Sequence, residues 1–200
     1  MARPFKKAFA DAAHVVRIDE TGLLLNPLVR RTWAPRGKTP VLESWGGHRR
    51  KASVIGAVTP SPIAPRLGFS CATEPDGYCT TEKVVGFLRD LLKHLPGKVV
   101  VVWDGGSNHK GPAMREVLRR NPRLRLERLP AYSPNLNPVE AVWSWLKYGQ
   151  LANFVPAGLI DLDDRILDRP IELGLDPGLL RQLWDASELP FPPPLKSKSG

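Results

Sequence analysis

Short apolar runs bounded by turn residues recur along the first part of the chain. Three of them, at residues 14–19, 51–59 and 66–73, are separated only by segments rich in turn residues, which indicates a meander of antiparallel strands. A fourth run, at 98–103, is almost wholly apolar, as in a strand buried on both faces. A fifth, at 124–129, alternates strictly between apolar and polar residues and predicts another strand.

Helical periodicity appears between these later strands and after them. From residue 81, apolar residues recur every three or four positions until Pro96 and Gly97 end the pattern. Further helices are expected at about residues 111–120 and 138–151, with helical pieces at 162–173 and 177–189. Three strands followed by alternating helices and strands predict an α/β fold, in which helices flank a mixed five-stranded sheet.

Charge is distributed unevenly along the chain, which has a formal net charge of +9. Basic residues concentrate between Leu28 and Lys51 and between Arg115 and Arg128, whereas the stretch after Val155 is acidic. A local basic excess suggests a polyanionic partner, most simply nucleic acid, although a solvated basic surface explains the charge equally well. The candidate DNA-binding residues are Arg30, Arg31, Arg49, Arg50, Lys51 and Lys147.

Composition argues against several classes of protein. The 200 residues suit one domain with a substantial core. Cys71 and Cys79 form neither a disulfide framework nor a zinc site, so we expect reduced thiols. The N-terminus does not look like a secretory signal, and the longest apolar run is far too short to cross a bilayer. We therefore expect a soluble, cytoplasmic protein with no membrane partner.

Three carboxylates stand at the ends of predicted elements. Asp19 ends the first strand, Asp104 ends the fourth, and Glu140 lies in the first turn of the helix that Pro138 begins. If the first and fourth strands are neighbours, the two aspartates lie close together and repel unless a cation lies between them. Oxygen ligands favour Mg²⁺ or Mn²⁺, and a third carboxylate would complete a pair of metal positions. Taken singly, each aspartate could instead begin a turn, and Glu140 could simply favour the helix dipole.

Three segments containing these acids closely resemble the blocks of the transposase catalytic domain of the IS630/Tc1/mariner superfamily. They are RIDETGLLLNPLVRRTWAPRGKTPVL, VVVVWDGGSNHKGPAMREVL and LPAYSPNLNPVEAVWSWLK, and they occur in the expected order. The last block is the most specific, and the likeness covers about residues 14–155.

This resemblance implies a ribonuclease H-like fold in which Asp19, Asp104 and Glu140 are the catalytic acids. They would bind two Mg²⁺ or Mn²⁺ ions and support DNA cleavage and strand transfer at the ends of an insertion element. No covalent protein intermediate is required, so no serine or tyrosine nucleophile is expected. We expect residues 1–155 to form the catalytic domain and residues 156–200 to form a helical extension with a disordered tail.

The resemblance also implies partners. These are the terminal inverted repeats and target DNA, and a second copy of the chain bound to the same DNA. The protein would then associate with the bacterial nucleoid. Such transposases carry helix-turn-helix domains before the catalytic domain, whereas this chain starts almost at the first strand. A separate helix-turn-helix polypeptide is therefore a candidate partner, and a separated catalytic fragment is the alternative.

Two other functions stay open, namely a catalytically decayed remnant that binds nucleic acid without specificity and a ribonuclease H-like nuclease acting on RNA–DNA hybrids. Retention of three acids argues against the first, and the block from Tyr132 to Glu140 argues against the second. His109 could contact phosphate, and Trp33 and Trp45 could stack on bases. For these three side chains, however, capping or packing roles are the favoured interpretation.

Overall fold

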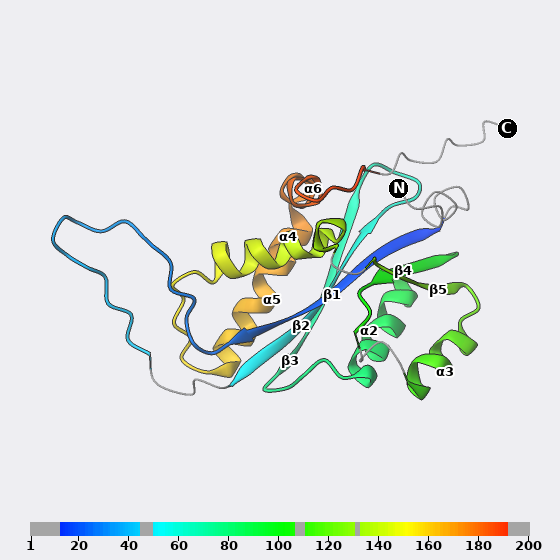
Figure 1. Ribbon diagram of the computed structural model, residues 1–200, viewed down its shortest axis with the longest axis horizontal. Coiled ribbons are helices and arrows are strands. Elements are labelled where there is room, and N and C mark those ends of the chain that lie inside the picture. The colour runs from blue at the N-terminus through cyan, green and yellow to red at the C-terminus, as the bar shows by residue number, and fades with distance from the viewer. Residues whose placement is uncertain (1–12, 45–49, 107–110, 131–132, 192–200) are drawn as a thin grey trace.

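The computed structural model describes residues 13–44, 50–106, 111–130 and 133–191 (Figure 1). It confirms the five predicted strands and their mixed sheet. The strands are β1 (His14–Leu24), β2 (Lys51–Pro60), β3 (Leu67–Pro75), β4 (Val99–Trp103) and β5 (Leu124–Arg128). Their order in the sheet is β3-β2-β1-β4-β5. The first three strands pair antiparallel, whereas β4 runs parallel to β1 and β5 runs parallel to β4.

The first strand is longer than the sequence predicts, so the expectation that Asp19 ends it is wrong. Antiparallel pairing with β2 continues as far as Leu24 opposite Lys51. Parallel pairing with β4 stops earlier, at Arg17 opposite Val102. Asp19 therefore lies within β1 but beyond the part that β4 covers. If the parallel register is continued two residues beyond the Arg17–Val102 pair, Asp19 lies level with Asp104, which directly follows β4.

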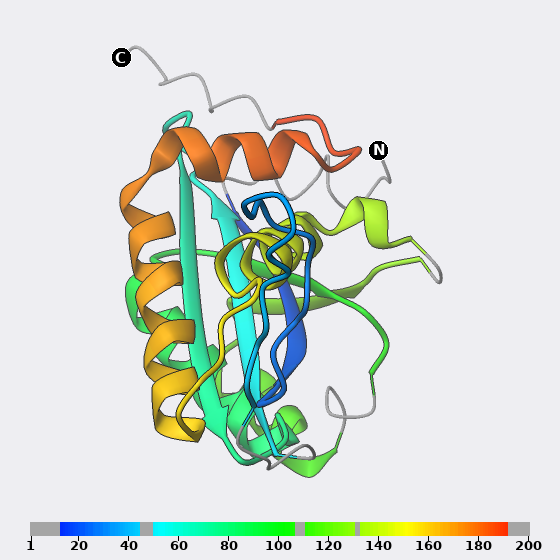
Figure 2. The ribbon, with the colours of Figure 1, turned by 90° about the vertical axis from the view of Figure 1, so that its left-hand side faces the viewer.

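Helices cover both faces of the sheet (Figures 1 and 2). One face carries α2 (Thr81–His94) and α3 (Pro112–Arg120). The other carries α4 (Pro138–Trp145), α5 (Leu159–Leu175) and α6 (Pro177–Asp185). The predicted helix at 138–151 is divided, because α4 passes into a π-helical turn, η3 (Leu146–Gln150). Helix α5 is continuous although Pro170 lies inside it.

Each face of the sheet has its own apolar core. On the first face, Val16 and Ile18 of β1 pack with Val84 and Leu88 of α2. On the opposite face, side chains of β2 pack against the three C-terminal helices. All five residues of β4 are buried, as their continuous apolar sequence predicts. In the described part of the chain, no helix is both long and apolar enough to span a membrane.

The C-terminal helices belong to the core of the second face. Leu162 and Ile166 of α5 and Trp184 of α6 share one buried cluster with Trp143 of α4. Phe191 lies edge-on to Trp184, with 6.0 Å between ring centroids, so packing continues into the start of the predicted tail. Residues 192–200 lie outside the described residues. The division of the chain at residue 155 stays a prediction.

Candidate active site

The three acids singled out from the sequence line one pocket. Asp19, Asp104 and Glu140 border a cavity of about 390 Å³, together with residues of β5 and of the loop before α4. Asp19 comes from within β1, Asp104 follows β4, and Glu140 lies in the first turn of α4. The pocket opens beside the carboxyl end of β4, the location where open α/β sheets form binding sites.

The loop before α4 is built to begin a helix at a fixed place. Pro134–Leu136 forms a short 3-10 helix, η2, and Asn137 caps the N-terminus of α4. The Asn137 side-chain oxygen accepts a hydrogen bond from the backbone N–H of Val139 at 3.4 Å. Pro138 occupies the first turn of α4, where its missing N–H costs nothing. Glu140 is thereby held in the first turn, with its carboxylate at the positive end of the helix dipole.

Three consecutive residues of β1 hold this loop and helix. The Arg17 guanidinium donates to the carbonyl oxygen of Leu136 at 3.3 Å. The Asn137 side-chain amide donates to the Ile18 carbonyl oxygen at 3.4 Å, and the Trp143 indole N–H donates to Asp19 Oδ2 at 3.0 Å. Arg17 is buried, which lowers its pKa to about 10 but leaves it protonated at neutral pH. These contacts fix α4, and therefore Glu140, relative to Asp19.

The Asp19 carboxyl is in an unfavourable place for a negative charge. Its pKa is raised to about 7, mainly because the group is largely buried and then because the Glu140 charge lies nearby. Hydrogen bonds from the Glu20 backbone N–H and the Trp143 indole oppose this shift of the pKa. A buried acid beside a second acid becomes fully ionised when a cation compensates the charge.

The other side of the pocket combines an acid with an arginine. Asp104 is exposed, and its Oδ1 accepts a hydrogen bond from the Gly106 backbone N–H at 2.9 Å. The guanidinium of Arg128, the last residue of β5, lies directly against Gly105. A Cβ atom at position 105 would lie within 2.2 Å of three guanidinium atoms, so any larger residue would displace the arginine. Arg128 therefore places a positive charge at the edge of the acidic pocket.

The donor set suits a hard divalent cation, because it consists of carboxylate oxygens in a solvent-accessible pocket. Within the described ranges, however, no three His, Cys, Asp or Glu side chains are gathered closely enough to hold one ion together. The arrangement of the acids therefore suits an ion that keeps several water molecules as ligands, as Mg²⁺ does. It equally suits two ions that share the carboxylates between them.

The predicted DNA-binding residues that the structure describes lie outside this pocket. Arg30 and Arg31 are exposed in the long loop after β1, and the Arg30 guanidinium stacks over Tyr148 at 5.1 Å. Arg50 forms an exposed ion pair of 2.8 Å with Asp76, an interaction weak enough for a phosphate to replace. Lys51 lies over the Tyr78 ring at 3.5 Å, and Lys147 borders a separate cavity beside β1. Arg49 lies outside the described residues.

One interpretation of an aromatic side chain is wrong. Trp33 was expected to pack in the core or in a loop, but its side chain is 100% exposed. It lies in the loop between β1 and β2, which extends away from the sheet (Figure 1). The positions of Trp45, His109 and Tyr132 lie outside the described residues.

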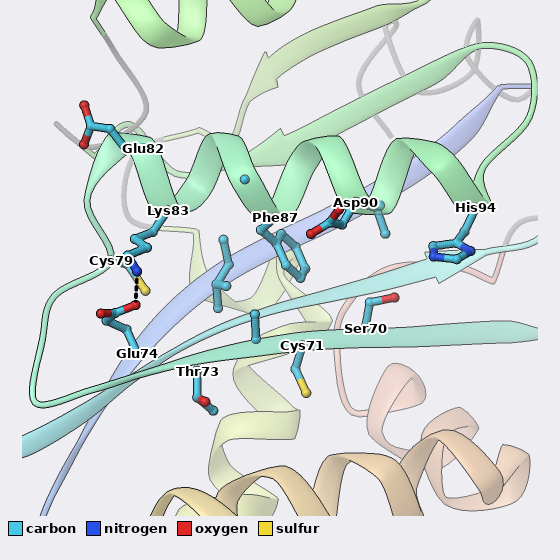
Figure 3. Close-up of a pocket in the computed structure, with 14 residues that line it drawn as sticks. Ser70, Cys71, Thr73, Glu74, Cys79, Glu82, Lys83, Phe87, Asp90 and His94 are labelled. Atoms are coloured by element: carbon cyan, nitrogen blue, oxygen red, sulfur yellow. Dashed lines mark ion pairs between the residues drawn. The ribbon is translucent and has the colours of Figure 1, made fainter.

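A second cavity lies between α2 and β3, away from the three acids (Figure 3). It has a volume of about 570 Å³, and the Glu74–Lys83 ion pair of 2.5 Å lies at one end. Both cysteines line it, and neither forms a disulfide. Burial raises the pKa of Cys71 and of Cys79 to about 11, so both remain protonated at neutral pH and are poor nucleophiles.

Three residues of the site were missed by the sequence analysis, namely Arg128, Asn137 and Trp143. Asn137 carries a local signal, since asparagine directly before Pro138 is typical of a helix N-cap. Arg128 could be inferred only from the pairing of β5 with β4, which puts it opposite Trp103 and next to Asp104. The indole of Trp143 contacts a residue 124 positions away, so no local pattern reports it.

A five-stranded mixed sheet flanked by helices, with three carboxylates at one pocket, is the arrangement of a ribonuclease H-like fold. Comparison with protein families agrees, because the family model described as DDE superfamily endonuclease matches residues 14–156. The chain belongs to this family. The resemblance found in the sequence is thereby confirmed.

Solved structures share the fold at low sequence identity. The Mos1 strand transfer complex is 18% identical, with a TM-score of 0.58, over 92% of this chain and 53% of that chain. The Mos1 mariner paired-end complex with Mn is 17% identical, with a TM-score of 0.59, over 92% and 56%. The corresponding complex with Mg is 17% identical, with a TM-score of 0.55, over 86% and 53%. The chain thus spans about half the length of these Mos1 chains, and no curated protein matches it significantly.

Proposed function

We propose that this chain is the catalytic domain of a DDE transposase, which cleaves DNA at insertion-element ends and transfers the strand to target DNA. The observation that carries the proposal is the convergence of Asp19, Asp104 and Glu140 on one pocket in a member of the DDE endonuclease family. The Mos1 relatives, described as a strand transfer complex and as paired-end complexes, support the step from nuclease to transposase.

Two divalent ions, Mg²⁺ or Mn²⁺, would polarise the phosphate and activate the attacking water or 3′-hydroxyl when bound. Asp19 and Asp104 are the residues that would hold them, and Glu140 would complete the second position. The Mos1 paired-end complexes with Mn and with Mg are consistent with this choice of ion.

The remaining pocket residues act on the substrate and on the geometry of the acids. Arg128 can donate hydrogen bonds to a phosphate beside Asp104, because its guanidinium lies at the edge of the same pocket. Asn137 and Arg17 keep the N-terminus of α4 against β1, which holds Glu140 at a fixed distance from Asp19.

We also propose the partners that this function requires. They are the terminal repeats and target DNA, contacted through the exposed arginines of the loop after β1, and a second copy of the chain on the same DNA. Phosphate contacts of this kind position DNA without reading its sequence. Recognition of the element ends would then fall to a helix-turn-helix region or to a separate polypeptide that carries one.

The proposal is tested by a strand-cleavage assay on a terminal-repeat duplex with Mg²⁺ or Mn²⁺. We expect wild-type protein to nick the duplex at its end, and Asp104→Asn to be inactive while binding the same DNA. Asp90→Asn, which changes an exposed acid on α2 that does not line the pocket, is the matched control and should retain activity.

Two substrates separate the alternatives. Cleavage of an RNA–DNA hybrid with no action on duplex DNA would replace the transposase with a ribonuclease H-like nuclease. DNA binding without metal-dependent cleavage of either substrate would identify a decayed remnant.

A further inference from the structure

The side chain of Trp143 joins the acid pocket to the core below it. The indole is buried, with only 2% of the residue exposed, and its N–H donates to Oδ2 of Asp19 at 3.0 Å. Trp143 lies three residues after Glu140, so both side chains project from neighbouring positions on α4. One helix therefore supplies an acid to the pocket and a hydrogen bond to a second acid.

The sheet is shaped to receive this ring. Gly56 of β2 is the cross-strand partner of Asp19, so a side chain at position 56 would lie beside the Asp19 carboxylate on the same face. The Trp143 ring occupies that place instead. A Cβ atom at position 56 would lie 2.6 Å from Cη2 and 2.9 Å from Cζ2 of the ring. Glycine is required here by the close approach of the indole.

Packing alone does not account for the hydrogen bond. Trp184 is equally buried, at 2% exposed, and belongs to the same apolar cluster. Its indole nitrogen has no hydrogen-bond partner in the described structure. A tryptophan can therefore fill this core without donating its N–H to an acid. Trp143 differs from Trp184 because its indole N–H donates to the Asp19 carboxylate.

We propose that Trp143 is a positioning residue. Its indole N–H fixes the rotation of the Asp19 carboxylate, so that the carboxylate is already oriented to coordinate a metal ion. The inference rests on the proposed function, since it assigns Asp19 to metal binding. The hydrogen bond occupies one lone pair of Oδ2 before any ion enters. Metal binding then requires less reordering of the carboxylate. Partners that orient metal ligands in this way typically change metal affinity or activity about 10–100-fold when they are removed.

The test compares Mn²⁺ affinity, measured by calorimetry, among variants. Trp143→Phe should weaken Mn²⁺ binding about tenfold or more. Trp184→Phe is the matched control, because it truncates an equally buried indole of the same cluster, and it should bind Mn²⁺ like wild type. Gly56→Ala should weaken binding as well, since the new Cβ displaces the indole ring although neither Trp143 nor Asp19 is itself replaced.

A second variant separates the N–H from the packing. Benzothienylalanine at position 143 keeps the shape of tryptophan but replaces the indole N–H with sulfur, so a variant that folds normally should still lose metal affinity. Cleavage by Trp143→Phe should recover in part when Mn²⁺ is raised. Because the ion also stabilises the folded state, circular dichroism at each Mn²⁺ concentration should show a constant folded fraction while cleavage recovers.

Each result decides the matter. Equal Mn²⁺ affinity in wild type, Trp143→Phe and the benzothienylalanine variant would overturn the positioning role. Equal losses in Trp143→Phe and Trp184→Phe would assign the effect to core packing and would also overturn it. Wild-type protein that binds no Mn²⁺ would overturn the proposed function itself, and this role with it.

Discussion

Replacing Asp19 with asparagine should stabilise the protein when no metal is present. Asp19 is mostly buried next to Glu140, and its pKa rises from 3.8 to about 7. Each unit of pKa corresponds to about 1.36 kcal/mol, so the shift sets a ceiling on the order of 4 kcal/mol for the cost of ionising Asp19 in the folded protein. The pocket admits water, which reduces the cost, and we expect a gain of about 1–3 kcal/mol from Asp19→Asn.

The sign of the pH dependence follows from the direction of the shift. The folded protein binds a proton at Asp19 more tightly than the unfolded chain does. The stability linked to this group is therefore fully present below pH 3.8 and is lost as the pH rises through about 7. The advantage of Asp19→Asn over wild type should be largest at about pH 8 and should shrink to about half of that near pH 5.5.

Urea unfolding in EDTA at these two pH values measures the difference directly. Asp104→Asn is the matched control, since Asp104 borders the same pocket but is exposed, and it should change stability much less. Adding Mn²⁺ should stabilise wild type and remove the advantage of Asp19→Asn, because the ion binds only the folded state. An Asp19→Asn variant no more stable than wild type at pH 8, or equally stabilised at both pH values, would refute the reasoning.

Three other side chains give measurable predictions. Arg128→Ala should slow DNA cleavage by about tenfold or more, as expected for a lost charged hydrogen bond, whereas Arg125→Ala, exposed on the same strand but outside the pocket, should not. Asn137→Ala should lower the free energy of unfolding by about 1–2 kcal/mol through loss of the α4 cap, and Asn135→Ala, exposed in the same loop, by clearly less. Burial, as the largest cause, lowers the pKa of His14 in the folded protein, so the unfolded chain binds the proton more readily and the free energy of unfolding should fall as the pH drops below 6.5. His14→Phe should flatten this part of the plot of unfolding free energy against pH, and an unchanged plot would contradict the prediction.

The elements that the sequence predicted correctly are those with a local signal. The continuous apolar run of β4 indicates a strand buried on both faces, and the helical period of α2 indicates a helix buried on one face. The structure has both elements as expected. The acids were found because strand ends and helix starts are also local features. Asp19 was nonetheless misplaced relative to its strand, since the end of β1 is set by pairing with β2 and not by its own residues.

Features that depend on distant pairs could not be predicted. The position of Arg128 follows from the β4–β5 register, and the need for glycine at position 56 follows from a ring on α4. Trp33 was assigned to packing because tryptophan is usually buried, but a loop that leaves the sheet offers it no surface to pack on. Both kinds of error concern tertiary contacts, which residue type and spacing do not encode.

The three consecutive β1 residues that hold the α4 segment also determine when the site can form during synthesis. Arg17 and Ile18 contact residues 119 positions further along the chain, and Asp19 contacts one 124 positions away. Translation proceeds from the N-terminus, so β1 to β4 are synthesised before the residues that order Asp19 and supply Glu140. A truncated or unfinished chain therefore carries two of the acids in an unanchored state. The three acids therefore come together only in chains extended past the first turn of α4, so any chemistry that needs the complete set must wait for this helix.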